Sequence, residues 1–106
     1  MERGEVRWYT FAEPDKSRPV LVLTRNSAIR YLNAVTVAPI TTTIRDVPSE
    51  IRLSIDDGMM TDCAVNFYNL QTLPKSGLGA WIATLSPGRM VEVDQAIQFA
   101  LGIDTA

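Results

Sequence analysis

Arg18 and the three consecutive residues Thr41, Thr42 and Thr43 carry the side chains of this sequence that best suit phosphate chemistry. Arg18 directly precedes the apolar run PVLVL, and the threonines follow the strand-like run VTVAPI. A guanidinium binds phosphate oxygens in a bidentate manner, and a hydroxyl can orient an oxyanion or a ribose. Two such groups at the ends of two core strands can converge on one place. The same spacing equally fits a plain structural role, in which Arg18 donates to turn carbonyls and the threonines only favour strand formation.

Few other residues in the sequence are suited to catalysis. The chain has no histidine, which removes the commonest general acid or base and the commonest metal ligand. Cys63 is the only cysteine, so the chain has neither an internal disulfide nor a thiolate zinc site, and we expect a reducing compartment, most simply the cytoplasm. We interpret Asp56 and Asp57 as solvated turn residues and Cys63 as a buried thiol. No nucleotide-binding or hydrolase motif is present, so we expect no metal and no cofactor.

Charge is spread unevenly along the chain. The formal net charge is −2, but residues 1–30 contain six basic and four acidic side chains, whereas the rest of the chain is acidic. We therefore expect a phosphate-facing surface to come from the first third of the sequence. No apolar run approaches the length of about 20 residues that a membrane span requires, so we expect no membrane partner.

The apolar pattern predicts one domain of 106 residues with short strands and a single long helix. Strands are expected over residues 5–11, 19–24, 34–40, 50–55, 63–67, 68–73 and 78–83, and the strand with the apolar run PVLVL is expected to be buried on both faces. Ser86 and Pro87 are typical of a helix start, and Gly102 is typical of a helix end. These elements predict a mainly β protein with a C-terminal helix, in which a strongly curved antiparallel sheet is closed or nearly closed as a small barrel. Trp8 and Phe67 are expected in its core, and Ile51, Leu53 and Ile55 are expected to point inward.

Several blocks of the sequence, spanning about residues 3 to 103, resemble the MazF/PemK family of type II toxins. In chain order these blocks are RGEVRWYTF, DKSRPVLVLTRNSA, VTVAPITTTIRDVPSEIRL, NLQTLPKSGLG and IATLSPGRMVEVDQAIQFALGI. The resemblance implies an SH3-like barrel that forms a homodimer. It also implies a metal-independent, sequence-specific endoribonuclease that acts on single-stranded RNA and is neutralised by a cognate antitoxin.

The same resemblance implies roles for individual residues. Arg18 matches the arginine of the family's R-P-V motif and Thr41 the threonine of its A-P-I-T motif, the pair expected to be catalytic. The implied reaction is attack of a ribose 2′-OH on the adjacent phosphate, in which Arg18 stabilises the developing charge and Thr41 positions the reacting group. Because single-stranded RNA is read by stacking and by base-edge contacts, further contacts are expected from loops 12–17 and 44–49 and from exposed aromatic and amide groups. The residues expected to bind RNA are Lys16, Ser17, Thr42, Thr43, Arg45, Tyr68, Asn69 and Gln71.

Two alternatives remain open at this stage. The CcdB toxins share the barrel fold but bind DNA gyrase through a tryptophan-containing tail on the last helix, and this chain ends without such a tryptophan. The other alternative is an inactive family member that only binds an antitoxin. Gln71 and Gly77 stand where basic residues are common in the family, which keeps this possibility open, whereas the presence of both Arg18 and Thr41 argues against it.

Overall fold

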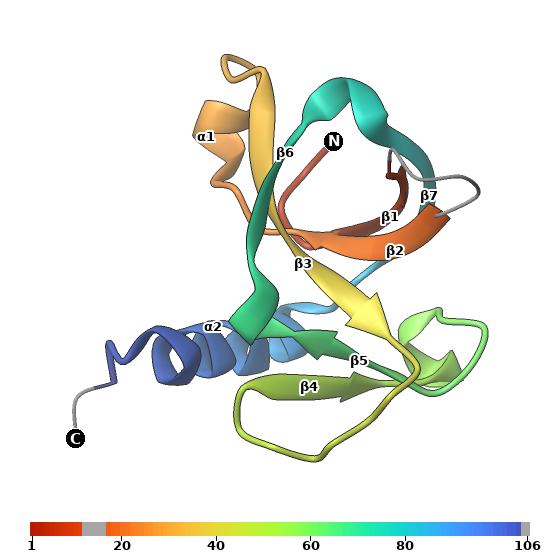
Figure 1. Ribbon diagram of the computed structural model, residues 1–106, viewed down its shortest axis with the longest axis vertical. Coiled ribbons are helices and arrows are strands. Elements are labelled where there is room, and N and C mark those ends of the chain that lie inside the picture. The colour runs from red at the N-terminus through yellow and green to blue at the C-terminus, as the bar shows by residue number, and fades with distance from the viewer. Residues whose placement is uncertain (12–16, 105–106) are drawn as a thin grey trace.

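The computed structural model describes residues 1–11 and 17–104 of the chain, which form short strands and one long helix (Figure 1). The prediction of a mainly β protein with a C-terminal helix is confirmed. In chain order the elements are β1 (Glu5–Thr10), β2 (Ser17–Val22), α1 (Asn26–Ile29), β3 (Ala34–Thr41), β4 (Glu50–Leu53), the 3-10 helix η1 (Ile55–Asp57), β5 (Cys63–Asn66), η2 (Phe67–Asn69), β6 (Gln71–Pro74), η3 (Lys75–Gly77), β7 (Leu78–Thr84) and α2 (Pro87–Leu101).

The strands form one strongly bent antiparallel sheet. Its order is β4-β5-β3-β2-β1-β7, and β6 pairs with β3 beside this path. The segment from β6 through η3 to β7 curls round, so that the upper strands surround a common interior (Figure 1). Within the described residues the pairing does not return from β7 to β4, so the sheet is a curved, incompletely closed barrel.

Strand β3 is shared between the two parts of the sheet. Its first half pairs with β6, residues 37–39 pair with β2, and its last residues, Ile40 and Thr41, pair with Val65 and Ala64 of β5. Pro39 lies at the point where the partner changes. Proline has no N–H to donate to a ladder, so it is accommodated where regular pairing is interrupted. The strand thereby carries the chain from the curled part of the sheet to the β4–β5 pair.

Because β2 and β3 lie in the middle of the molecule, both faces of these strands are covered. One face contributes Leu21, Ala38 and Ile40 to a core shared with β4, β5 and α2, and the other contributes Val20, Val22 and Val37 to the interior of the curled strands. The prediction that PVLVL is buried on both faces is confirmed, since all residues from Val20 to Leu23 are buried. Two separate cores therefore hold this pair of strands in place.

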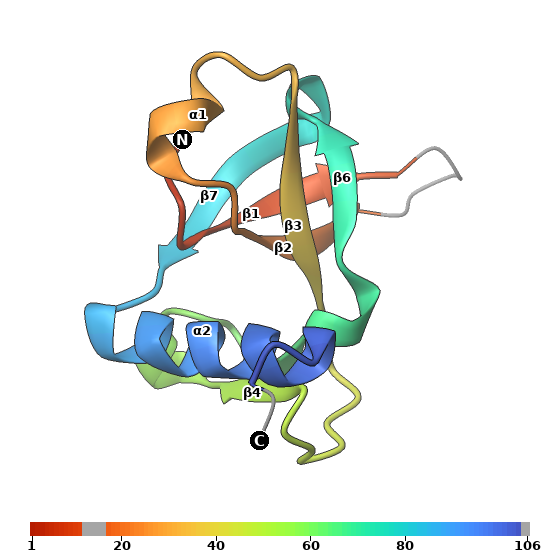
Figure 2. The same cartoon turned by 90° about the vertical axis from the view of Figure 1, so that its left-hand side faces the viewer.

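Helix α2 packs beside the β4–β5 pair, below the curled strands (Figure 2). The Ser86 hydroxyl accepts a hydrogen bond from the Arg89 N–H at 3.2 Å, Pro87 is the first helical residue, and Gly102 ends the helix with φ = 73°, as predicted. Val93 and Ala96 are buried against the sheet. No helix within residues 1–11 and 17–104 is long and apolar enough to cross a membrane.

Two of the five predicted core positions are wrong and three are confirmed, since Ile51, Leu53 and Phe67 are buried. Phe67 is completely buried, but Trp8 is 38% exposed because its side of β1 faces a surface cavity rather than the core. Ile55 is 72% exposed because β4 ends at Leu53. The Ser54 hydroxyl accepts from the Asp56 N–H and starts η1, which breaks the alternation that would have turned Ile55 inward.

Candidate active site

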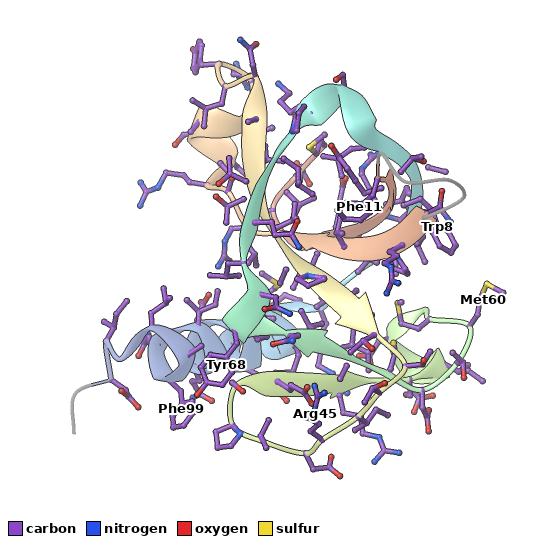
Figure 3. The ribbon with its side chains drawn as sticks, in the orientation of Figure 1. Trp8, Phe11, Arg45, Met60, Tyr68 and Phe99 are labelled. Carbon is purple, nitrogen blue, oxygen red and sulfur yellow. The ribbon has the colours of Figure 1, made fainter. Side chains whose placement is uncertain are left out.

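A cavity of about 270 Å³ opens where the start of β2 approaches the end of β3. Its lining is mainly apolar and comes from β1, β2, the end of β3, the segment after η1, β5 and β7. The residues are Trp8, Pro19, Ile40, Thr41, Thr42, Met59, Met60, Thr61, Cys63 and Ile82. Figure 3 shows Trp8 and Met60 on the same side of the molecule, the side toward which β3 ends. Two of the predicted site residues, Thr41 and Thr42, lie in this cavity.

Arg18 is not itself a lining residue of this cavity and adjoins it through its chain neighbour Pro19. The β2–β3 ladder ends at the pair Val20–Pro39, so Arg18 and Thr41 each lie two residues beyond its last pair, and Arg18 is paired with Tyr9 of β1. Pro19, the residue next to Arg18, lines the cavity together with Thr41. The start of β2 and the end of β3, which carry the residues predicted to bind phosphate, therefore lie at the same end of the strand pair.

The hydroxyl of Thr41 is oriented by a backbone N–H two residues further along the chain. The Thr43 N–H donates a hydrogen bond to Thr41 Oγ1 at 3.1 Å, which occupies one acceptor position of the hydroxyl oxygen. A hydroxyl has one hydrogen to donate and two lone pairs. Because one lone pair is already used, the hydroxyl hydrogen remains available to donate to a phosphate oxygen in the cavity. Thr43 thus acts at this site through its main chain, while its side chain is exposed.

The Arg18 guanidinium is exposed and forms no ion pair with any residue in the described part of the chain. This distinguishes it from four other arginines, which are bound to carboxylates: Arg3, Arg7, Arg52 and Arg89. A guanidinium without a carboxylate partner keeps its donors available for an incoming anion. Of the arginines, Arg18 is the one that combines this state with a position next to the cavity-lining Pro19.

An ion pair between η1 and α2, which the sequence interpretation missed, holds the segment just before the lining residues Met59 and Met60. Asp57 is not a solvated turn residue: Oδ1 and Oδ2 accept from Nε and Nη2 of Arg89 at 2.8 and 3.1 Å, and Oδ2 also accepts from the Ser54 N–H at 3.0 Å. Hydrogen bonding to Arg89 holds the pKa of Asp57 below its ordinary value. This pair ties η1 to helix α2, and the residues that follow η1, Met59 and Met60, line the cavity.

Cys63 also lines the cavity but is unsuited to nucleophilic chemistry. Burial raises the pKa of its thiol, and the nearby charges of Asp57 and Asp62 raise it further. The expectation of a buried cysteine is confirmed, and the raised pKa keeps its thiol protonated at neutral pH. Among the described residues, no group of three or more acidic, cysteine or histidine side chains is arranged to hold a metal ion.

Other predicted RNA contacts gather at a second, more polar hollow of about 500 Å³. Arg45, Tyr68 and Phe99 line it, together with the end of the segment that joins β3 to β4. Figure 3 shows Tyr68 and Phe99 close together beside α2, away from Trp8. The β3–β4 connection runs between the two places, since it starts with Thr42 in the first cavity and ends beside the second.

The remaining predicted residues lie near these two places or outside the described residues. Asn69 and Gln71 are exposed in the chain segment that follows Tyr68. The Ser17 hydroxyl lies 3.0 Å from that of Thr10 across the β1–β2 pair. Lys16 and most of loop 12–17 lie outside the described residues. The cavity-lining residues Met59, Met60, Thr61 and Ile82 were not predicted, because they come from segments far from Arg18 and Thr41 in the sequence and form no motif with them.

Comparison with known proteins identifies the class to which this fold and site belong. A family model described as "PemK-like, MazF-like toxin of type II toxin-antitoxin system" matches residues 2–101. The chain therefore belongs to the PemK-like and MazF-like toxins of type II toxin–antitoxin systems.

Individual members of this family are similar over nearly the whole chain. "Probable endoribonuclease MazF2" of Mycobacterium tuberculosis is 40% identical over 103 residues, which cover 96% of this chain and 99% of that protein. The solved structure of the M. tuberculosis toxin MazF-mt6 is 35% identical, has a TM-score of 0.84, and matches 92% of this chain and 96% of that chain. An endoribonuclease from a mycobacterial species, solved in complex with its cognate antitoxin, has a TM-score of 0.86 at 27% identity and matches 96% and 95% of the two chains.

Proposed function

We propose that this chain is the toxin of a type II toxin–antitoxin system, and that it inhibits translation and growth by cleaving single-stranded RNA at short sequence motifs. The proposal rests on family membership over residues 2–101 and on similarity to proteins named as endoribonucleases. The structural observation that supports it is that Thr41 and Pro19, the residue next to Arg18, line one open cavity. The sequence resemblance matches Arg18 and Thr41 to family motifs.

The chemistry that suits these groups is cleavage assisted by the RNA itself. The ribose 2′ oxygen gives its proton to a solvent water and forms a bond to the adjacent phosphorus, and the bond from phosphorus to the 5′ oxygen breaks. The 5′ oxygen takes a proton from solvent water, which leaves a 2′,3′-cyclic phosphate and a 5′-hydroxyl. In this reaction Arg18 stabilises the negative charge on the phosphorane oxygens. Thr41 donates its hydroxyl hydrogen to the phosphate and holds it in line.

No metal ion or cofactor is needed for this reaction. A guanidinium supplies the positive charge that a metal would otherwise bring to the phosphate, and it remains charged throughout the physiological pH range. Since the chain has no histidine, we expect the cleavage rate to show no titration near pH 6.5, the ordinary histidine pKa. This separates the proposed mechanism from one that uses a pair of histidines.

We also propose that the toxin works as a cytoplasmic homodimer neutralised by a cognate antitoxin. Met60 and Trp81 are large apolar side chains exposed to solvent, which provides apolar surface for a second copy. The mycobacterial endoribonuclease described above was solved with its antitoxin bound, and a small acidic antitoxin suits the basic residues in the first third of this chain. Light scattering of the purified protein measures the oligomeric state, and a monomer at micromolar concentration would contradict the dimer.

The activity is tested by incubating the purified protein with a mixed-sequence single-stranded RNA in excess EDTA and mapping the ends of the fragments. The expected result is cutting at a short recurring motif that leaves 5′-hydroxyl ends. A DNA gyrase supercoiling assay with the same preparation serves as the comparison. Inhibition of gyrase without RNA cleavage would instead support the CcdB-like alternative, and neither activity would support an inactive, antitoxin-binding member.

A further inference from the structure

Most of the acidic side chains lie in one half of the molecule. We call β1, β2, α1, β3, β6, η3 and β7 the curved half, and β4, β5, α2 and the segments that adjoin them the helix half (Figure 2). Every acidic residue from Asp46 onward lies in the helix half, and residues 17–45 contain none. Among the described residues of the curved half the acids are Glu2 and Glu5, and Glu5 is bound to Arg7.

Three cations of the curved half lie around α1. Arg25 and Arg30 flank this helix, are exposed, and form no ion pair with the described residues. Lys75 is fixed beside them, because its Nζ donates to the Ile29 carbonyl at 2.7 Å and its N–H donates to the Asn33 carbonyl at 2.8 Å. We call Arg25, Arg30 and Lys75 the α1 corner. These hydrogen bonds leave the positive charge of Lys75 without a carboxylate partner.

The shape and the neighbouring residues of the α1 corner suit a polyanion. Arg30 and Lys75 line a hollow of about 390 Å³ in which Glu2 is the single acidic residue. Next to Arg30 the ring of Tyr31 is 79% exposed, which is unusual for a large aromatic side chain that has no partner to cover it. Cations that follow a phosphate backbone together with exposed aromatic rings are the combination that binds single-stranded nucleic acids.

We propose that the α1 corner binds the phosphate backbone of single-stranded RNA several nucleotides away from the cut, with Tyr31 as a stacking surface for a base. The proposal rests on the RNA-cleaving function proposed above. The corner is distant from the candidate active site: β3 begins with Ala34 beside α1 and ends with Thr41 at the cavity, and its seven residue steps span about 23 Å at roughly 3.3 Å each. An RNA just long enough to fill the cavity cannot reach both places.

This distance makes the length of the RNA the decisive variable. The test compares cleavage of a short RNA, with the cut motif and one nucleotide on either side, with cleavage of a 30-nucleotide RNA that contains the same motif. The variant is Arg25→Gln/Arg30→Gln, since Lys75 also holds α1 and is left unchanged. We expect kcat/KM to fall roughly tenfold for the long RNA and to stay unchanged for the short one. For the long RNA, the slope of log KM against the logarithm of the salt concentration should become shallower by about 1.4. This corresponds to about 0.7 for each of the two lost phosphate contacts.

A charge-matched control separates local contact from net charge. Arg52→Gln/Gln95→Glu makes the same change of two charges on exposed residues of the helix half, and it should leave the ratio of long to short RNA unchanged. Equal losses for both RNA lengths in the α1-corner variant, or an equal loss in the control, would overturn the proposal. An acidic peptide that binds the parent but not the α1-corner variant, with long-RNA cleavage unaffected, would show that the corner is a polypeptide site and would also overturn it.

Failure of the proposed function is distinguishable from failure of this inference. Fluorescence anisotropy of a labelled 30-nucleotide RNA measures binding whether or not the RNA is cut. If the parent binds RNA without cleaving it and the α1-corner variant binds more weakly, the proposed nuclease function is wrong, but RNA binding at the α1 corner is supported. If the parent cleaves RNA and the variant cleaves both lengths as fast as the parent, the α1 corner does not bind RNA, but the nuclease function is supported.

Discussion

Replacing Gly77 by alanine should destabilise the protein and impair the candidate site at the same time. A Cβ at position 77 would lie 2.5 Å from Cε2 and Cζ of Tyr9 and 2.6 Å from its hydroxyl oxygen. Unstrained carbon contacts lie near 3.5 to 4.0 Å, so the ring or η3 must move by about 1 Å. The Tyr9 ring is buried and packs against Phe11 with ring centroids 4.8 Å apart, which leaves it little room to move.

The magnitude follows from known costs of overpacking. Inserting a methyl group into a filled core costs about 1 to 3 kcal/mol, and loss of glycine's freedom in the unfolded chain offsets about 0.4 to 1 kcal/mol of this. A net loss of about 1.5 kcal/mol lowers the Tm by about 6 to 12 °C in a domain of this size. Tyr9 is paired directly with Arg18 across β1 and β2. Movement of Tyr9 should therefore shift Arg18 and slow RNA cleavage even well below the Tm.

The assay is thermal unfolding followed by circular dichroism, combined with RNA cleavage at 20 °C. Gly79→Ala is the matched control, because a Cβ there would meet its nearest neighbour, the Trp8 carbonyl oxygen, at an ordinary 3.6 Å. In a Tyr9→Leu background the added methyl at position 77 should cost less than in the parent. If Gly77→Ala melts within about 2 °C of the parent, or no lower than Gly79→Ala, the reasoning about Tyr9 and Gly77 is refuted.

Three further predictions concern single side chains. Because Arg89 holds the pKa of Asp57 low, the ionised carboxylate contributes stability above the unfolded pKa of about 3.9, and this contribution is lost as pH falls through the lower folded pKa. Asp57→Asn should therefore lower the free energy of unfolding, measured in urea, by about 2 kcal/mol at pH 7. It should also weaken the loss of stability that acidification causes in the parent; an unchanged loss on acidification would contradict this. Trp8→Ala should raise KM for RNA by roughly tenfold, as expected for loss of one stacked base, with a Tm shift of less than about 3 °C; a large Tm loss at unchanged KM would instead place Trp8 in the core. Ser86→Ala should cost about 1 kcal/mol in urea unfolding through loss of the N-cap of α2, and no loss would contradict the cap.

The sequence predicted those parts of the fold that are determined by local pattern. The buried run PVLVL, the N-cap at Ser86 and the left-handed end at Gly102 each depend on a few neighbouring residues, and each is confirmed. Ile55 was predicted incorrectly because period-two alternation does not show where a strand ends. Ser54 begins a 3-10 turn with its side chain, and this local hydrogen bond takes precedence over the apolar pattern.

The candidate site was predictable only in part, for a different reason. Arg18 and Thr41 stand beside recognisable strands, so the nearness of their two segments follows once those strands are paired. The ion pair of Asp57 with Arg89 joins residues that are 32 positions apart, and neither residue belongs to a motif that indicates the other. The concentration of acidic side chains in the helix half likewise depends on which strands curl together, so the sequence showed an uneven charge distribution without its location in space.

The central claim is that Arg18 and Thr41 cleave RNA without a metal ion, and single-turnover cleavage in EDTA tests it most directly. The rates to compare are those of the parent, Arg18→Ala, Thr41→Ala and the control Arg52→Ala, at saturating protein and with folding verified by Tm. Loss of one preorganised donor to a developing oxyanion costs about 100- to 1,000-fold. We predict such a loss for Arg18→Ala, a smaller loss for Thr41→Ala, and a parent-like rate for Arg52→Ala. A parent-like rate for Arg18→Ala, with the same cut sites, would contradict the account.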